Sequence, residues 1–212
     1  MAFGPYKITE EFEKAICDYT GAPFCCVVDS CSHAIFLSLK YQIRIANINI
    51  SKNIRIPKHT FPSIPCEIIH AGLNVRFYDS PKVMKGPYRL EPTKVWDSAL
   101  RFTKDMYMPD SFMCISFTGP RKKLKLIKGG AILHDSPDAQ KWFISARMSG
   151  RHECSFMEDN IQFPGWNYYL DPEKSARGLM LIREFYNEEG EALPNLDVEC
   201  EYPDLSLMDA FK

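Results

Sequence analysis

Several short apolar runs of the sequence are each followed by residues that could take part in chemistry. The first run, 24–29, leads into Ser30, Cys31 and Ser32 at the start of a helical pattern. Backbone N–H groups at the start of a helix have no partner within the helix, so they form a ready site for an anion. The sequence therefore predicts an anion site at this turn, although plain helix capping is the simpler interpretation.

Later runs end in an aromatic ring, a carboxylate and a basic stretch. Phe61 follows the run 54–57, Asp97 ends the run 94–97, and "GPRKKLKLIKGG" follows the run 111–117. An anion site, a flat ring, a carboxylate and a lysine together match the needs of pyridoxal 5′-phosphate (PLP). This cofactor forms a Schiff base with a lysine and pairs its pyridinium nitrogen with a carboxylate.

The elements that must position these residues alternate between strand and helix patterns. Strand patterns lie at 24–29, 54–57, 74–79, 94–97, 111–117 and 130–135, and helix patterns at 8–21, 30–42, 63–72, 137–150 and 171–190. This alternation predicts an α/β fold with a mostly parallel sheet flanked by helices. Such sheets bind ligands beyond the carboxyl ends of their strands, so the groups named above should meet at one edge. We expect one domain over 1–190 and a polar C-terminal tail over 191–212.

Composition excludes several classes of function. The 212 residues carry a formal net charge of −1, whereas proteins that bind phosphate backbones usually have a clear basic excess, so we expect no nucleic-acid partner. No apolar run approaches the ~20 residues of a membrane span, and the N-terminus lacks a signal-peptide pattern, so we expect a cytoplasmic protein with no membrane partner. His59, His70 and His134 lack paired ligand spacing, and no metal site is expected.

Five stretches in chain order share their patterns with one known family: "FEKAICDYTGAPFCCVVDSCSHAIFLSL", "IPKHTFPSIPCEIIHAGLNVRFYD", "VWDSAL", "ISFTGPRKKLKLIKGGAIL" and "PGWNYYLDPEKSARGLMLI". Together they resemble the DegT/DnrJ/EryC1/StrS family of PLP-dependent sugar aminotransferases, over about residues 12–182. The resemblance implies the large domain of the aspartate-aminotransferase fold (fold type I). It also implies PLP as cofactor, with a nucleotide-linked keto-sugar and an amino-acid donor as substrates.

The resemblance also implies roles for individual residues. Asp97 would keep the pyridinium nitrogen protonated, and Phe61 would stack on the ring. Ser32, Ser116 and the amides around Cys31 would hold the phosphate.

The stretch "PGWNYY" carries a further implied contact. Asn167 would reach the phosphate of a neighbouring subunit's cofactor, so the active site would be shared across a homodimer. A helix cap or a turn is the simpler interpretation of Asn167.

The Schiff-base lysine follows from two family spacings that disagree by one residue. Counting five residues after Ser116 gives Arg121, whose guanidinium stays protonated and cannot do this chemistry. Counting seven residues before Gly129 gives Lys122, and one extra residue near Gly119 reconciles the two counts. We therefore predict Lys122, with Lys123 as the alternative.

Departures from the family pattern keep other interpretations open. Leu100 stands where the family usually has Gln or His, Cys31 stands where Gly is usual, and the segment between Asp79 and Lys94 is short. The C-terminal small domain of the family has no room, which would make this a truncated, minimal member. The alternatives are a non-catalytic homologue that serves as a binding or scaffold protein, and an unrelated α/β domain that binds a phosphorylated ligand.

Overall fold

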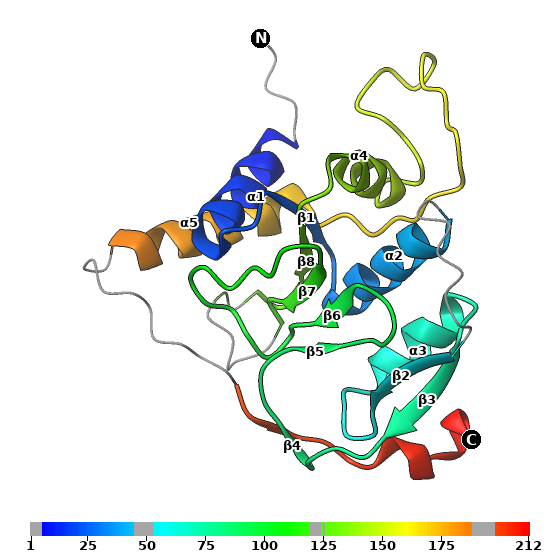
Figure 1. Cartoon of the computed structure of the whole chain (residues 1–212). Helices are drawn as coiled ribbons and strands as arrows, with labels where there is room; N and C mark the ends of the chain where they lie inside the picture. Colours follow the sequence, from blue (N-terminus) through cyan, green and yellow to red (C-terminus); the bar gives the residue numbers. More distant parts are fainter. Residues whose placement is uncertain (1–5, 45–52, 119–123, 125, 188–197) are drawn as a thin grey trace.

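The computed structural model describes residues 6–44, 53–118, 124, 126–187 and 198–212. Its centre is a five-stranded sheet in the order β1-β8-β7-β6-β5. The strands are β1 (Phe24–Val28), β8 (Gly130–His134), β7 (Phe112–Ser116), β6 (Val95–Asp97) and β5 (Tyr88–Arg89). Helices cover both faces of this sheet (Figure 1).

The residues of β1 show how the two-residue period of a strand divides the core. Cys25 and Val27 pack into a cluster with α1 (Lys7–Thr20) and α5 (Pro172–Asn187). Cys26 and Val28 pack into a second cluster with α2 (Cys31–Arg44) and α4 (Pro137–Ala146). Successive side chains of a strand point to opposite faces, so a continuous apolar run is what a strand between two helical layers requires.

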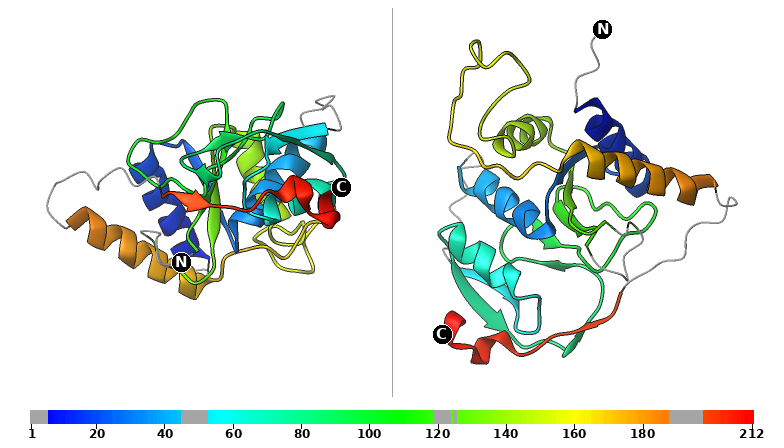
Figure 2. Two further views of the ribbon diagram at one scale, coloured as in Figure 1. Left: turned by 90° about the horizontal axis from the view of Figure 1, so that it is seen from below. Right: turned by 180° about the vertical axis from the view of Figure 1, so that it is seen from behind.

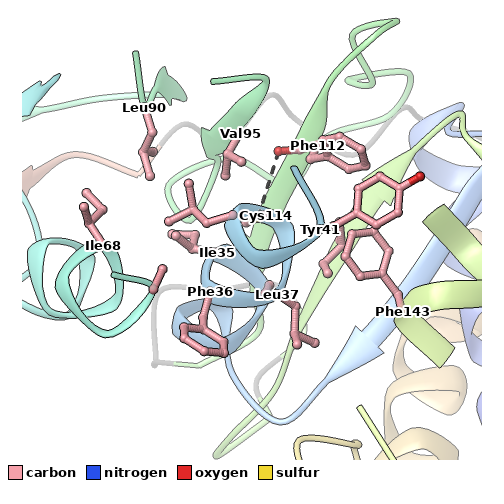
Figure 3. Close-up of a cluster of buried hydrophobic side chains, with 14 of the residues drawn as sticks. Ile35, Phe36, Leu37, Tyr41, Ile68, Leu90, Val95, Phe112, Cys114 and Phe143 are labelled. Carbon is pink, nitrogen blue, oxygen red and sulfur yellow. Dashed lines mark hydrogen bonds between the residues drawn. The ribbon is translucent and has the colours of Figure 1, made fainter. Parts of the chain in front are cut away.

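The buried hydrophobic cluster that contains α2 is the larger of the two clusters described. Ile35 and Leu37 of α2 are fully buried, and Figure 3 shows the Ile35 side chain beside those of Cys114 and Val95 from the sheet. The same cluster extends to α3 (Ser63–His70) through Ile68. Burying α2 in this way fixes its N-terminus at the ends of β1 and β7.

Smaller elements extend the structure beside the main sheet. The parallel pair β2 (Asn53–Pro57) and β3 (Asn74–Tyr78) is connected through α3, and β4 (Val83–Met84) pairs with β9 (Cys200–Glu201). Two short 3₁₀ helices follow, η1 (Leu205–Leu207) and η2 (Asp209–Phe211). The segment that carries β9 runs past β4 toward β3, and both rear and lower views show it on the same side of the molecule as β2 and β3 (Figure 2).

The predicted α/β class with helices flanking a sheet is confirmed, but the strand pairing differs from the expected mostly parallel arrangement. Within the five-stranded sheet, β6–β7 is parallel, while β1–β8, β7–β8 and β5–β6 are antiparallel. The strands β1, β7 and β6 do point the same way, because β8 lies between β1 and β7 and runs opposite to both. Helix ends also shift, since α4 ends at Ala146 rather than near residue 150.

A buried ion pair ties α1 to β1 and α4. The Glu13 carboxylate accepts hydrogen bonds from Arg147 and from the Val27 amide at 2.8 Å, and Arg147 also donates to the Val27 carbonyl at 2.7 Å. Burial raises the pKa of Glu13, and the Arg147 guanidinium partly offsets this effect. Loss of either partner would leave an unpaired charge in the core.

His134 makes stability depend on pH. It is fully buried, its Nε2 lies 2.9 Å from the Gln140 Oε1, and burial lowers its pKa from 6.5 to about 4. Below pH 6.5 the unfolded chain binds a proton that the folded chain does not, so this stability is present above pH 6.5 and is lost as pH falls toward 4. We expect the free energy of unfolding to fall by about 2 kcal/mol between pH 7.5 and pH 5 through this group.

Urea unfolding at the two pH values measures this loss. His134→Gln, which has no titrating ring, should show a smaller loss than the wild type by about that amount. Equal pH dependence in wild type and His134→Gln would contradict the prediction.

Candidate functional site

A cavity of about 590 Å³ lies where strands of the five-stranded sheet and of the β2–β3 pair end. It brings together six of the residues singled out in the sequence: Ser30, Cys31, Ser32, Phe61, Asp97 and Ser116. These residues follow β1, follow β2, or end β6 and β7. The carboxyl ends of strands that point the same way therefore supply one edge, as in other α/β proteins.

The N-terminus of α2 forms one side of the cavity. The Ser30 hydroxyl accepts a hydrogen bond from the His33 amide at 3.2 Å, so this side chain caps the helix. The Ser32 hydroxyl donates to the Ser63 hydroxyl at 2.7 Å, which joins the starts of α2 and α3. Amides in the first turn of a helix have no partner within the helix, and their dipoles favour an anion.

Gly130 allows β8 to approach this turn closely. A Cβ atom at Gly130 would lie 2.5 Å from the Cys31 nitrogen, 2.7 Å from the Ser30 carbonyl carbon and 2.8 Å from the Cys31 Cα. All three neighbours are backbone atoms, so no side chain can move aside. The position of the anion turn relative to the sheet therefore depends on the absence of a side chain at residue 130.

Asp97 lies at the end of β6 and is only 6% exposed. Its Oδ1 accepts a hydrogen bond from the Ala99 amide at 2.9 Å. The Tyr88 hydroxyl shares a hydrogen bond with Thr60, and burial followed by the nearby negative charge of Asp97 raises the pKa of Tyr88 well above its usual value. Tyr88 is thus a neutral hydrogen-bonding group beside a buried carboxylate.

The ring of Phe61 is 55% exposed. It lines the cavity together with Leu100, the residue that stands where the resembled family has Gln or His. An exposed aromatic face on a cavity wall is suited to stacking against a flat ligand.

The lysines of the basic stretch divide into two groups. Lys122 and Lys123 lie outside the described residues, so the structure does not place the predicted Schiff-base lysine. Lys128 does line the cavity, and its Nζ lies 2.9 Å from the Asp29 Oδ2. Partial burial opposes ionisation of Asp29, but hydrogen bonds from His33 and Lys128 outweigh it and lower the pKa of Asp29. This ion pair holds the Lys128 side chain at the edge of the cavity.

Asn167 does not line the cavity. It forms a bridge to Met148 beyond the end of α4, and its neighbour Trp166 packs edge-on against Phe36 at 5.1 Å between ring centroids. Within a single chain Asn167 therefore contributes to the connection between α4 and α5.

Among the other lining residues, six matter for the arguments below, and none of them was assigned a role from the sequence: Thr60, Tyr88, Lys128, Val198, Cys200 and Tyr202. Thr60 is the immediate neighbour of Phe61, and Lys128 directly precedes the two glycines of the lysine loop, so both were adjacent to recognised motifs. Tyr88 lies in the short segment between Asp79 and Lys94, which carries no motif. Val198, Cys200 and Tyr202 belong to the stretch "VECEY", whose alternation of apolar and charged residues is typical of a strand.

Two negative findings apply to the described part of the chain. None of its helices is both long and apolar enough to cross a membrane. No group of three or more His, Cys, Asp or Glu side chains there is arranged to hold a metal ion.

Comparison with known proteins supports the resemblance drawn from the sequence. The sequence model of the DegT/DnrJ/EryC1/StrS aminotransferase family matches residues 2–95, which confirms the resemblance over this part of the chain. No curated protein matches the chain in sequence.

Solved structures of sugar aminotransferases share the fold at low sequence identity. Helicobacter pylori PseC, an aminotransferase of pseudoaminic acid biosynthesis, superposes with a TM-score of 0.69 at 15% identity over 84% of this chain and 58% of its own. DesV from S. venezuelae gives 0.67 at 15% identity, over 87% of this chain and 58% of its own. The sugar aminotransferase CalS13 from Micromonospora echinospora gives 0.66 at 15% identity, over 92% and 70%. The chain thus spans less than two thirds of PseC and DesV.

Proposed function

We propose that this chain binds PLP in the described cavity and acts as an aminotransferase on a nucleotide-linked keto-sugar. The observation that carries the proposal is the convergence of an α2 N-terminus, an exposed Phe61 ring and the buried Asp97 carboxylate on one cavity of about 590 Å³. The family match over residues 2–95 and the shared aminotransferase fold support the same chemistry.

The residues present fit this cofactor part by part. The first turn of α2, with Ser32 and with Ser116 at the end of β7, offers hydroxyl and amide donors to a phosphate. Phe61 offers an exposed face to a flat ring, and Asp97 offers a carboxylate to a protonated ring nitrogen. Gly130 leaves the space that brings the sheet against the phosphate turn.

Bound PLP supplies an electron sink that stabilises negative charge on the carbon next to the reacting amino group. Asp97 would hold the proton on the ring nitrogen, because an adjacent carboxylate favours the charged pyridinium. Lys122 would bind the cofactor covalently and, once an amino donor displaces it, move a proton to or from the substrate carbon as a free amine. Lys128, held by Asp29, would add positive charge at the cavity edge.

A spectroscopic titration tests the proposal. Wild-type protein mixed with PLP should develop a visible absorbance band that borohydride bleaches, and the reduced cofactor should remain attached after denaturation. Glutamate should then change the spectrum of the unreduced complex, because it donates its amino group to the cofactor. Protein that shows neither a band nor a retained mass would overturn the proposal.

A non-catalytic homologue that keeps the fold as a binding or scaffold protein is the second candidate. Two observations favour it: Leu100 lines the cavity, and the chain spans only 58% of the PseC and DesV chains. The spectral response of the PLP complex to added glutamate distinguishes the two candidates. A complex that binds PLP but whose spectrum does not respond to glutamate, or to other amino donors, would favour the second candidate.

We also propose a homodimer in which Asn167 contributes to the partner's phosphate site. Asn167 lies away from the cavity of its own chain, as a residue that serves a neighbour would. Light scattering at micromolar concentration should give twice the chain mass, and Asn167→Ala should weaken PLP binding by about tenfold without altering the mass, because one charge-assisted hydrogen bond is lost. Ser149→Ala, next to the same bridge, serves as control. A monomeric PLP complex would contradict the shared site.

A further inference from the structure

The extended segment Val198–Tyr202, here called the C-terminal wall, alternates between the cavity and solvent. Val198, Cys200 and Tyr202 line the cavity. Glu199 and Glu201 lie exposed between them. Because successive side chains of an extended chain point to opposite sides, this pattern shows that one whole face of the segment belongs to the cavity.

The outward glutamates fix the register of the wall. Glu199 pairs with Lys85 at 3.3 Å, and Glu201 pairs with Lys82 at 2.5 Å. Both lysines flank β4, whose residues Val83 and Met84 pair with β9. A slip of one residue would turn the glutamates into the cavity, so their charges oppose that slip.

Backbone hydrogen bonds hold both ends of the wall. The Val198 amide donates to the Leu100 carbonyl at 2.8 Å, and the Tyr202 amide donates to the Lys82 carbonyl at 3.1 Å. The Tyr202 carbonyl lies 3.0 Å from the His59 Nδ1. Beyond the wall, Leu205 is fully buried. The wall is therefore anchored on both sides of the cavity rather than lying loosely over it.

Tyr202 is the residue of the wall that contacts Phe61, one of the proposed cofactor residues. Its ring packs edge-on against Phe61, with 6.3 Å between ring centroids. Burial, then Cys200, and then the negative charges of Asp97 and Cys31 raise the pKa of the Tyr202 hydroxyl, which therefore stays protonated. Tyr202 thus packs against the exposed Phe61 ring and lies close enough to Asp97 for the charge of that carboxylate to act on its hydroxyl.

We propose that the C-terminal wall is part of the binding site and that Tyr202 contacts the ligand seated between Phe61 and Asp97. The inference rests on the proposed function, because it takes PLP as that ligand. The bound ring would lie beside the Tyr202 side chain, whose hydroxyl can donate a hydrogen bond to it. Val198 and Cys200 would exclude water from the same side of the site.

Two measurements on the full chain test the inference. Tyr202→Ala should weaken PLP binding by about tenfold in an absorbance titration, since an aromatic contact and a hydrogen-bond donor are removed. Leu207→Ala, which alters an exposed side chain of η1 outside the cavity, is the control and should bind as wild type does. In wild type, PLP should slow alkylation of Cys200 several-fold while Cys154, which is exposed, reacts unchanged.

The outcomes separate this inference from the proposed function. If wild type binds PLP, but Tyr202→Ala binds equally or more tightly and Cys200 is not protected, the inference is wrong and the proposed function stands. If wild type does not bind PLP, the proposed function fails and the inference fails with it. If Tyr202→Ala does not fold, the Cys200 protection measured in wild type decides alone.

Discussion

Replacing Lys122 with alanine is expected to abolish covalent attachment of PLP altogether. The physical reason is the need for a primary amine that can lose its proton at the correct distance from the cofactor carbonyl carbon, which Arg121 cannot provide because its guanidinium stays protonated. The measurement is borohydride reduction of the PLP complex, followed by protease digestion and mass mapping. Wild type should carry the label on Lys122, and Lys122→Ala should carry none.

Two other lysines make the matched controls. Lys123→Ala changes the alternative residue of the same loop and should keep the label on Lys122. Lys128→Ala changes the lysine that lines the cavity beside Asp29 and should also keep the label, with weaker binding because a positive charge at the cavity edge is lost. Label found on Lys123 or Lys128 in wild type would show that the assignment of Lys122 is wrong.

Replacing Gly130 with alanine is expected to lower the free energy of unfolding substantially and to weaken binding at the start of α2. The added carbon would lie 2.5 Å from the Cys31 nitrogen, so β8 and the start of α2 would have to separate. Overpacking of this kind costs about 1–3 kcal/mol and more where only backbone can move. Urea unfolding gives the loss of stability, and a PLP titration of the folded fraction gives the loss of binding.

Gly72→Ala is the control for this experiment. Gly72 has a φ of +88°, and a Cβ atom added there would have no neighbouring atom within 4 Å, so alanine meets backbone strain but no clash. We expect a cost of about 1–2 kcal/mol and unchanged PLP affinity. Gly130→Ala protein that is as stable as wild type, or that binds PLP equally well, would refute the close-approach explanation.

The sequence predicted those parts of the fold that depend on local patterns. The apolar run before Ser30 and the helical pattern after it indicated a buried strand followed by α2, and both are confirmed. The direction of β8 was not predicted, because its run 130–135 is apolar whichever way the strand points. Neighbour order in a sheet is decided by contacts between distant segments, which a local pattern does not record.

The candidate site was predictable where a motif marked it and not elsewhere. Asp97, Phe61 and Ser116 each end or follow a recognisable run, and the cavity contains all three. The Val198–Tyr202 wall was missed because its alternation covers only five residues within a polar region that holds two prolines. The assignment of Lys122 rests on spacings from Ser116 and from Gly129 that differ by one residue. Lys122 also lies outside the described residues.

The pairing of β4 with β9 joins segments made at widely separated times during translation. Pairing of strands that lie far apart in the sequence raises the contact order of a fold. Such pairings form slowly, because the entropy of closing the long loop is lost before the contact contributes any stabilising free energy. The elements up to β8 can fold while synthesis continues, but Val198–Tyr202 cannot pair with β4 until Tyr202 has been synthesised. A nascent chain halted before that point would have the start of α2 in place but would leave one side of the cavity open to water.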